Sequence, residues 1–188
     1  MTEQLAVLGR PIAHSRSPEI HQLFAAQAGM DIAYDRLLVP EGKFRETALG
    51  FLETGKGCNI TLPCKHDAFL LADELSPGAE QAQAVNTLSK TPGGQLRGDN
   101  TDGPGLVNDL VRNLGWEIAG RRVLVLGAGG AVSGVLPDLI AAGPTVLHVS
   151  NRTHEKAVAL VTRQREPLAQ AVALNDLNET YDLIINGT

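Results

Sequence analysis

Residues 122–131, RVLVLGAGGA, decide the fold of the second half of the chain. The segment runs from Val123 to Leu126 without a polar residue, as in a strand that is buried on both faces. The glycines of GAGGA follow directly, and an apolar helical pattern begins at Val132. In this arrangement, backbone N–H groups at a helix N-terminus bind a pyrophosphate. The match to G-x-G-x-x-G is incomplete because Val132 stands at the third glycine, so the stretch alone also fits a turn that binds nothing.

The residues that end the next strand indicate which cofactor such a turn would take. The segment 145–151, TVLHVSN, reads as that strand, and NRT (151–153) ends it with Lys156 one helical turn later. A site for NAD places Asp or Glu here to bind the ribose 2′-hydroxyl, whereas an Arg suits the 2′-phosphate of NADP. Arg152 therefore favours NADP. The same residues also fit an exposed helix start that is capped by Thr153.

Strands and helices alternate along the rest of the chain, which predicts an α/β fold with mainly parallel sheets. The change in sequence texture after GDNTDG (98–103) predicts an N-terminal α/β domain over 1–102 and a Rossmann-type domain over 103–188. The expected strands are 5–10, 32–39, 58–62, a hairpin of 84–90 and 94–98, 122–127, 145–151, 171–174 and 182–186. The expected helices are 17–29, 44–54, 65–75, 104–115, 132–143 and 153–164.

The charge balance and the cysteine content narrow the possible functions. Sixteen Lys and Arg against twenty-one Asp and Glu give a net charge of −5, so we expect no nucleic-acid surface, which needs a basic face. We expect no signal peptide and no membrane helix, which needs roughly 18 consecutive apolar residues. Cys58 and Cys64 fit neither a disulfide framework nor a zinc spacing, and the histidines form no metal motif. We therefore expect a cytoplasmic protein that binds a small molecule as a monomer or a homodimer, with no metal.

A second group of polar residues lies at element ends in the first half of the chain. Ser15 and Ser17 precede a helix, with Ser17 as the predicted N-cap, and this position suits a carboxylate. NITLPCK (59–65) places an Asn, a Thr and a Lys at the end of one strand, and GDNTDG adds Asp102. Each of these residues alone is more simply explained as a cap or a solvated side chain, so the functional signal lies in their combination.

That combination resembles a known family. HSRSP (14–18), NITLPCK, AVNT (84–87), GDNTD (98–102), GAGGA and NRT occur in the order and spacing seen in shikimate dehydrogenases, over almost the whole chain. The resemblance implies an oxidoreductase that reduces 3-dehydroshikimate to shikimate with NADPH, on the route to chorismate and the aromatic amino acids.

The resemblance also implies a role for each site residue. Lys65 and Asp102 would be catalytic. The substrate would be held by Ser15, Ser17, Asn59, Thr61, Lys65, Asn86 and Asp102. The cofactor would be held by Gly127, Ala128, Gly129, Gly130, Ala131, Asn151, Arg152, Thr153, Lys156 and Thr188.

The chemistry explains why a lysine fits. Hydride transfer to a carbonyl leaves negative charge on its oxygen, so a cationic donor stabilises the transition state and supplies the proton. Lys65 would be the acid in reduction and the base in oxidation, with Asp102 orienting it. Because a lysine ordinarily keeps its proton at neutral pH, we expect shikimate oxidation to accelerate in the alkaline range.

Three features depart from the family pattern. Cys64 stands where an aromatic or other apolar residue is more common, and Ser133 stands where many members have Arg. Four predicted strands in the second domain fall short of the six in a doubly wound fold, so we expect a C-terminal part of the family's chain to be missing. DLIIN (182–186) would then form an exposed apolar edge, and turnover would be weak.

Two alternatives to this function stay open. The chain could be a quinate/shikimate dehydrogenase of broader specificity, or a non-catalytic fragment that binds NADP or shikimate.

Overall fold

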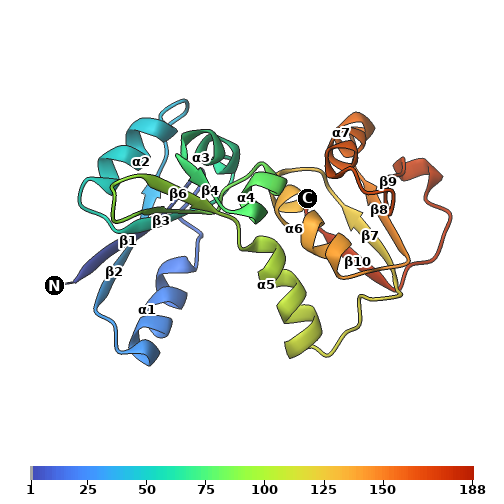
Figure 1. Cartoon of the computed structure of the whole chain (residues 1–188), viewed down its shortest axis with the longest axis horizontal. Coiled ribbons are helices and arrows are strands. Elements are labelled where there is room, and N and C mark those ends of the chain that lie inside the picture. Colours follow the sequence, from blue (N-terminus) through green and yellow to red (C-terminus); the bar gives the residue numbers. More distant parts are fainter. Residues whose placement is uncertain (1) are drawn as a thin grey trace. The chain divides into compact units, whose positions relative to one another are not determined.

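The computed structural model describes residues 2–188. The chain forms two compact units, of which the first ends at Asn100 and the second begins at Thr101. This division falls two residues before the boundary expected from the sequence. Each unit has its own sheet and its own apolar core, and strands of both sheets are labelled in Figure 1.

The first unit is built on a six-stranded mixed sheet in the order β2-β1-β3-β5-β6-β4. Strands β1, β2 and β3 are parallel, and β5 and β6 form the predicted antiparallel hairpin. The short β4 pairs in parallel with β6. The strands are β1 (Glu3–Gly9), β2 (Ile32–Leu38), β3 (Gly57–Ile60), β4 (Glu74–Leu75), β5 (Thr87–Lys90) and β6 (Leu96–Asp99).

Helices cover this sheet unequally. Helices α2 (Phe44–Leu52) and α3 (Lys65–Leu71) lie on one face, where their apolar side chains form the main core with β1, β3 and β5. Helix α1 (Ser17–Ala28) lies on the other face beside β2. There, Val7, Ile12 and Tyr34 form a small separate cluster. The short helix α4 (Pro77–Ala82) lies between β4 and β5 along the chain.

The second unit contains a four-stranded parallel sheet in the order β10-β7-β8-β9. Numbered within this unit, the order is 4-1-2-3, which is the first part of a doubly wound fold. Strand β10 is an edge strand with Ile184 59% exposed, as the sequence predicted. The strands are β7 (Arg122–Leu126), β8 (Val146–Ser150), β9 (Ala169–Ala171) and β10 (Leu183–Asn186).

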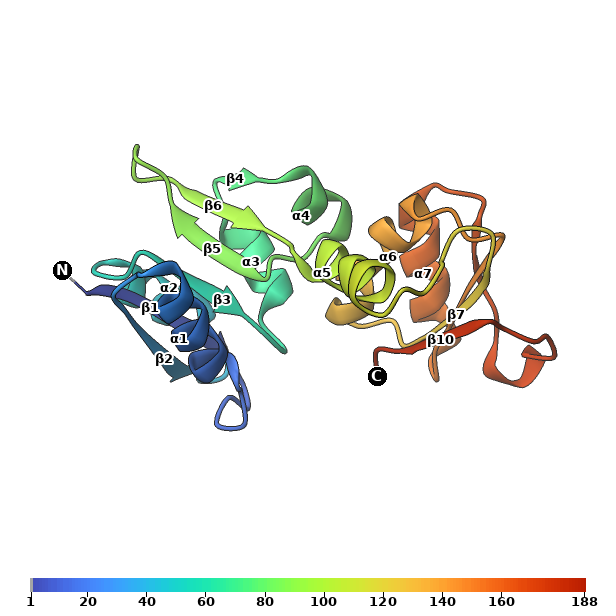
Figure 2. The ribbon, with the colours of Figure 1, turned by 90° about the horizontal axis from the view of Figure 1, so that it is seen from below.

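Three helices accompany the second sheet, as Figure 2 shows from another side. They are α5 (Asp102–Asn108), α6 (Gly130–Ala141) and α7 (His154–Gln164). Residues of α6 and α7 form the core with alternate residues of β7 and β8. Helix α5 packs against α6 and continues as a π-helical segment, Asp109–Asn113. The approach is close: a Cβ on Gly103 would lie 2.0 Å from Oδ2 of Asp138.

Several predicted boundaries were wrong for local reasons. The helix expected over 65–75 ends at Leu71, because residues 73–75 turn to pair with β6, and the Asp73 carboxylate accepts the backbone N–H of Leu96. Neither β4 nor α4 was predicted. The first helix of the second unit starts at Asp102 instead of 104. The strand expected over 171–174 is β9 at Ala169–Ala171, and Leu174 begins a 3-10 turn.

Candidate functional site

Gly127 and Gly129, in the glycine-rich turn after β7, have different structural roles. Gly127 has φ +114°, a conformation that side chains rarely adopt, and a Cβ there would lie 2.8 Å from the carbonyl oxygen of Gly187. The Gly127 N–H donates to the carbonyl of Ser150, which ties the turn to β8. A Cβ on Gly129, in contrast, would meet no atom within 4 Å. Gly127 is therefore required by the fold, whereas the space beside Gly129 is open to a ligand.

A cavity of about 520 Å³ lies beside this turn. It is lined by Leu126, Gly127, Ala128, Gly129, Ser150, Asn151, Arg152, Thr153, Lys156, Leu174 and Thr188. Eight of the ten predicted cofactor residues are among them. Gly130 and Ala131 are not, and they form the first turn of α6 instead. Ser133 is buried in α6, away from this lining.

The charge and polarity of this cavity fit the phosphates of NADP. Its described lining holds two cations, Arg152 and Lys156, and no carboxylate. The Asn151 side chain donates to the Thr153 carbonyl (2.8 Å), which shapes the start of α7, and Thr153 is the N-cap residue but makes no side-chain capping hydrogen bond. The buried Ser150 Oγ has no hydrogen-bond partner within the described chain. The phosphates of a dinucleotide are bound by cationic side chains and by backbone N–H groups that no side chain covers, and this cavity offers both.

Sequence reasoning missed Leu126, Ser150 and Leu174 in this cavity. Ser150 directly precedes the NRT motif, so its position at the strand end was a usable signal. Leu174 comes from the turn after β9, where the strand was predicted in the wrong register, and no motif marks it.

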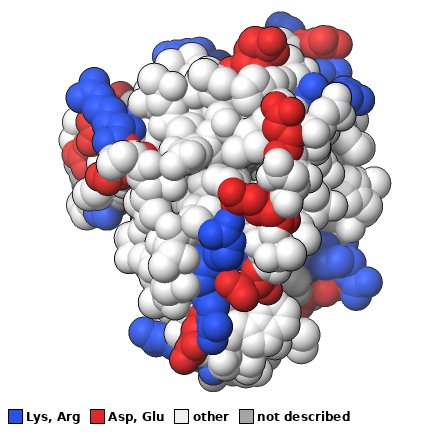
Figure 3. Space-filling view, turned by 90° about the vertical axis from the view of Figure 1, so that its right-hand side faces the viewer, with Lys and Arg blue, Asp and Glu red and all other residues white. Residues whose placement is uncertain are grey.

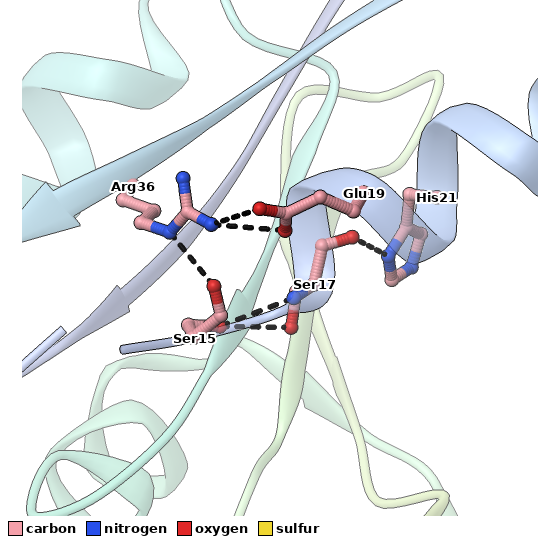
Figure 4. Close-up of polar contacts among 5 residues, drawn as sticks. All are labelled: Ser15, Ser17, Glu19, His21 and Arg36. Carbon is pink, nitrogen blue, oxygen red and sulfur yellow. Dashed lines mark hydrogen bonds and ion pairs between the residues drawn. The ribbon is translucent and has the colours of Figure 1, made fainter. Parts of the chain in front are cut away.

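In the first unit, the segment before α1 is held by a network that Figure 4 shows. Ser15 Oγ donates to Ser17 Oγ (3.1 Å) and accepts the Ser17 N–H (3.3 Å). Arg36 of β2 donates to the Ser15 carbonyl (2.7 Å) and binds both oxygens of Glu19 (2.7 and 2.9 Å). The N-cap of α1 is Arg16, so the prediction that Ser17 caps this helix was wrong. The Ser15 hydroxyl accepts the N–H of Ser17, the first residue of the helix, and both serine hydroxyls lie at the helix start.

A second series of hydrogen bonds joins β2, the last part of β3 and the start of β5. The Tyr34 hydroxyl donates to Asn59 Oδ1 (2.7 Å), and Asn59 Nδ2 donates to Thr87 Oγ1 (3.1 Å) and to the Asn86 carbonyl (3.4 Å). Thr87 Oγ1 in turn donates to Asn86 Oδ1 (2.9 Å). The structure therefore brings the two predicted substrate asparagines together. Sequence reasoning named neither Tyr34 nor Thr87, although Thr87 closes the AVNT motif.

Backbone contacts position the residues that follow β3. The Thr61 N–H donates to the Leu8 carbonyl (2.9 Å), and a Cβ on Gly9 would lie 2.4 Å from the Thr61 methyl, so only glycine allows this approach. Lys65 is the first residue of α3, and its carbonyl accepts the Val85 N–H (2.9 Å). This bond ties Lys65 to the segment that carries Asn86.

Asp102 begins α5 in the second unit, whereas Lys65 belongs to the first. The residues just before it are firmly held: Asp99 Oδ1 accepts from Ser76 Oγ (2.5 Å) and from the Asn100 N–H (2.7 Å). The Asn100 side chain donates to the Ala84 carbonyl (2.9 Å). The expected pairing of Lys65 with Asp102 across the two units stays a prediction.

The two cysteines are free and buried on the main core of the first unit. Burial raises the pKa of the Cys58 thiol to about 12 and also raises the pKa of Cys64. Cys64 is 3% exposed and packs as an apolar residue, as expected from its place in the family pattern.

Membrane-spanning helices and metal-binding clusters are both absent from the described residues. No helix in the described part of the chain is both long and apolar enough to span a membrane. Nowhere in residues 2–188 do three or more His, Cys, Asp or Glu side chains gather as they would around a metal ion. On the face shown in Figure 3, acidic and basic side chains are interspersed.

Comparison with known proteins gives consistent results over the whole chain. A family profile described as the shikimate dehydrogenase substrate binding domain matches residues 7–88, and one described as shikimate / quinate 5-dehydrogenase matches residues 109–188. A curated shikimate dehydrogenase (NADP(+)) of Alkalilimnicola ehrlichii is 50% identical over 190 residues, which cover 100% of this chain and 70% of the relative.

Solved structures agree with this match. An Ael1 enzyme from Pseudomonas putida superposes with a TM-score of 0.91 at 40% identity. Shikimate 5-dehydrogenase from Thermus thermophilus, in complex with NADP(H) and shikimate, superposes with a TM-score of 0.88 at 34% identity. Both matches cover 100% of this chain and 69% of the other.

Proposed function

Because the chain belongs to the shikimate dehydrogenase family, we propose that it catalyses the reversible NADPH-dependent reduction of 3-dehydroshikimate to shikimate, on the route to chorismate and the aromatic amino acids. The observation that carries this proposal is the hydrogen-bonded series in the first unit. It gathers Asn59 and Asn86 at neighbouring strand ends, where they offer the polar groups that a polyhydroxylated ring needs. With both thiols free, a reducing compartment such as the cytoplasm suits the protein.

The substrate carboxylate would bind at Ser15 and Ser17. Both hydroxyls lie at the start of α1, where the helix dipole favours a negative charge. Arg36 holds the Ser15 carbonyl and Glu19 rigidly, so the serines are positioned before a ligand arrives. Preorganised donors of this kind lower the cost of binding.

The ring hydroxyls would be held by Asn59, Thr61, Asn86 and Asp102, with Lys65 at the reacting oxygen. In the reductive direction the Lys65 ammonium would stabilise the negative charge that develops on the carbonyl oxygen and transfer its proton there. In oxidation it would take the same proton from the hydroxyl. Asp102 would orient the lysine and contact the same hydroxyl.

The second unit would hold NADP, which supplies or accepts the hydride when bound. The backbone of Gly127, Ala128 and Gly129 would contact the pyrophosphate, and Gly130 and Ala131 would present their N–H groups from the start of α6. Arg152 and Lys156 would bind the adenosine phosphate, aided by Asn151 and Thr153. Thr188 lies in the same cavity lining and would contact the cofactor beside the glycine turn.

A direct test is the absorbance change at 340 nm when shikimate is added with NADP. We expect Lys65→Ala to lower kcat by at least about 100-fold, the usual contribution of general acid–base catalysis, while the Kd for NADP stays within about twofold. Lys43→Ala is the matched control, because Lys43 is the N-cap residue of α2 and forms a surface ion pair with Glu46. Unchanged kcat in the Lys65 variant would refute its role, and no shikimate-dependent NADPH formation by the wild-type protein would refute the proposed function.

A broader quinate/shikimate dehydrogenase is the second candidate, and the description of the profile that matches residues 109–188 favours it. The absence of a carboxylate from the described lining beside Arg152 argues against the NAD use expected of such an enzyme. Quinate and NAD in the same assay separate the two candidates. Turnover of quinate at a rate comparable to that of shikimate would select the broader enzyme.

A further inference from the structure

Tyr34 lies between the two groups of residues that we assign to the substrate. It is on β2 and is only 5% exposed, yet its hydroxyl donates to Asn59 Oδ1 at 2.7 Å. Its ring stacks on His21, with the ring centroids 4.4 Å apart, and His21 Nδ1 lies 2.9 Å from the Ser17 carbonyl. The side chain is thus fixed by the serine segment on one side and by β3 on the other.

The hydrogen bonds around Asn59 determine which way its amide points. The Asn86 carbonyl can only accept, so the atom facing it must be Nδ2, and Oδ1 then faces the Tyr34 hydroxyl. Thr87 Oγ1 can donate or accept, so it does not choose between the two orientations. The contact with the Asn86 carbonyl is long at 3.4 Å, whereas the phenol bond is short at 2.7 Å. The Tyr34 hydroxyl can also donate or accept, so the Asn86 carbonyl sets the orientation of the amide, and the short phenol bond then holds Oδ1 in place.

Burial keeps this phenol in the form that donates. Loss of solvent raises the pKa of Tyr34 above its ordinary value, the neighbouring Cys58 adds to the rise, and a hydrogen bond from the Ser17 side chain opposes it. The hydroxyl therefore stays protonated at any pH at which the enzyme works. A buried hydroxyl costs free energy unless it is hydrogen-bonded, and the Asn59 amide and the Ser17 side chain both serve as partners of this one.

We infer that Tyr34 is a positioning residue for the substrate: it holds the Asn59 amide so that the second lone pair of Oδ1 accepts a hydrogen bond from a ring hydroxyl. This inference rests on the proposed function. Tyr34 itself does not take part in proton or hydride transfer. Its removal should therefore weaken shikimate binding and leave the chemical step and the cofactor site almost unchanged.

The experiment compares Tyr34→Phe with the wild-type protein by calorimetric titration of shikimate and of NADP. We expect the Kd for shikimate to rise about tenfold, as for the loss of one buried hydrogen bond, with kcat and the Kd for NADP within about twofold. Phenylalanine keeps the ring that stacks on His21, and a thermal melt checks that the variant is folded. Tyr181→Phe is the matched control, because its hydroxyl contacts His148 in the second unit.

A double-mutant cycle with Asn59→Ala tests whether Tyr34 acts through Asn59. If it does, Tyr34→Phe should change the shikimate Kd by less than about twofold once Asn59 is already alanine, because coupled residues are not additive. Two independent effects that multiply would overturn the inference, and so would a Tyr34→Phe variant that binds shikimate like the wild type. In both cases the proposed function would stand. A wild-type protein that binds no shikimate would overturn both.

Discussion

Substituting Gly127 and Gly129 by alanine, one at a time, should separate an effect on folding stability from an effect on cofactor binding. In Gly127→Ala, φ of +114° imposes a strain of about 1–3 kcal/mol. In addition, the new methyl would lie 2.8 Å from the Gly187 carbonyl oxygen, so the wall of the cavity must move. Gly129 has φ −92° and ψ −172°, which alanine adopts freely, and its Cβ would meet no atom within 4 Å.

The expected outcomes differ in kind. Gly127→Ala should lower the free energy of unfolding of the second unit by at least about 2 kcal/mol, or about 10 °C in Tm for a unit of this size. Gly129→Ala should cost about 1 kcal/mol of stability or less, the difference between glycine and alanine as the N-cap of α6. Its methyl, however, would occupy the space where a pyrophosphate meets the backbone. We expect the Kd for NADP to rise roughly five- to hundredfold, the cost of an overpacked contact.

Urea unfolding followed by the fluorescence of Trp116 measures the first effect, because this single tryptophan lies in the second unit. Calorimetric titration with NADP measures the second. The reasoning would be refuted if Gly129→Ala bound NADP as tightly as the wild type, or if it unfolded as easily as Gly127→Ala.

Two further predictions concern charge. Arg152→Ala should raise the Kd for NADP roughly ten- to hundredfold, as expected for a lost hydrogen bond to a charged group, and should leave the weaker binding of NAD almost unchanged; equal losses for both cofactors would contradict a contact with the 2′-phosphate. The Cys58 thiol has its pKa raised by burial from 9.0 to about 12, so the stability it contributes is complete below pH 9 and is lost as the pH rises toward 12. The free energy of unfolding lost in this way is at most about 4 kcal/mol. Urea unfolding under reducing conditions should show a smaller loss of stability between pH 9 and 10 in Cys58→Ala than in the wild type, and equal losses would contradict this prediction.

The parts of the fold that could be predicted from the sequence are those with long, uniform patterns. The continuous apolar run from Val123 to Leu126 predicted a buried strand, and Thr91-Pro92-Gly93 predicted the turn of a hairpin. Strand β4 and helix α4 could not be foreseen, because β4 is two residues long and exists only through its pairing with β6.

The residues of the candidate site also fall into those that the sequence predicted and those that it did not. Residues within a contiguous motif, such as Gly127 and Arg152, were found because local spacing identifies them. Tyr34 was missed because its contact with Asn59 spans 25 residues of sequence, and a tyrosine on a strand ordinarily indicates only packing. Leu174 reaches its cavity from a turn whose position depends on the register of β9.

The position of β10 beside β7 also sets an order of assembly during synthesis. Arg122 and Asp182 lie 60 residues apart in sequence but are joined where the two strands begin to pair. Because the cavity beside the glycine turn has Thr188 in its lining, it is completed only when β10 and Thr188 have left the ribosome and β10 has been added to the sheet. The first unit ends at Asn100 and has its own core, so its folding does not depend on β10. We therefore expect a nascent chain to gain its serine and asparagine network before it can hold a nucleotide.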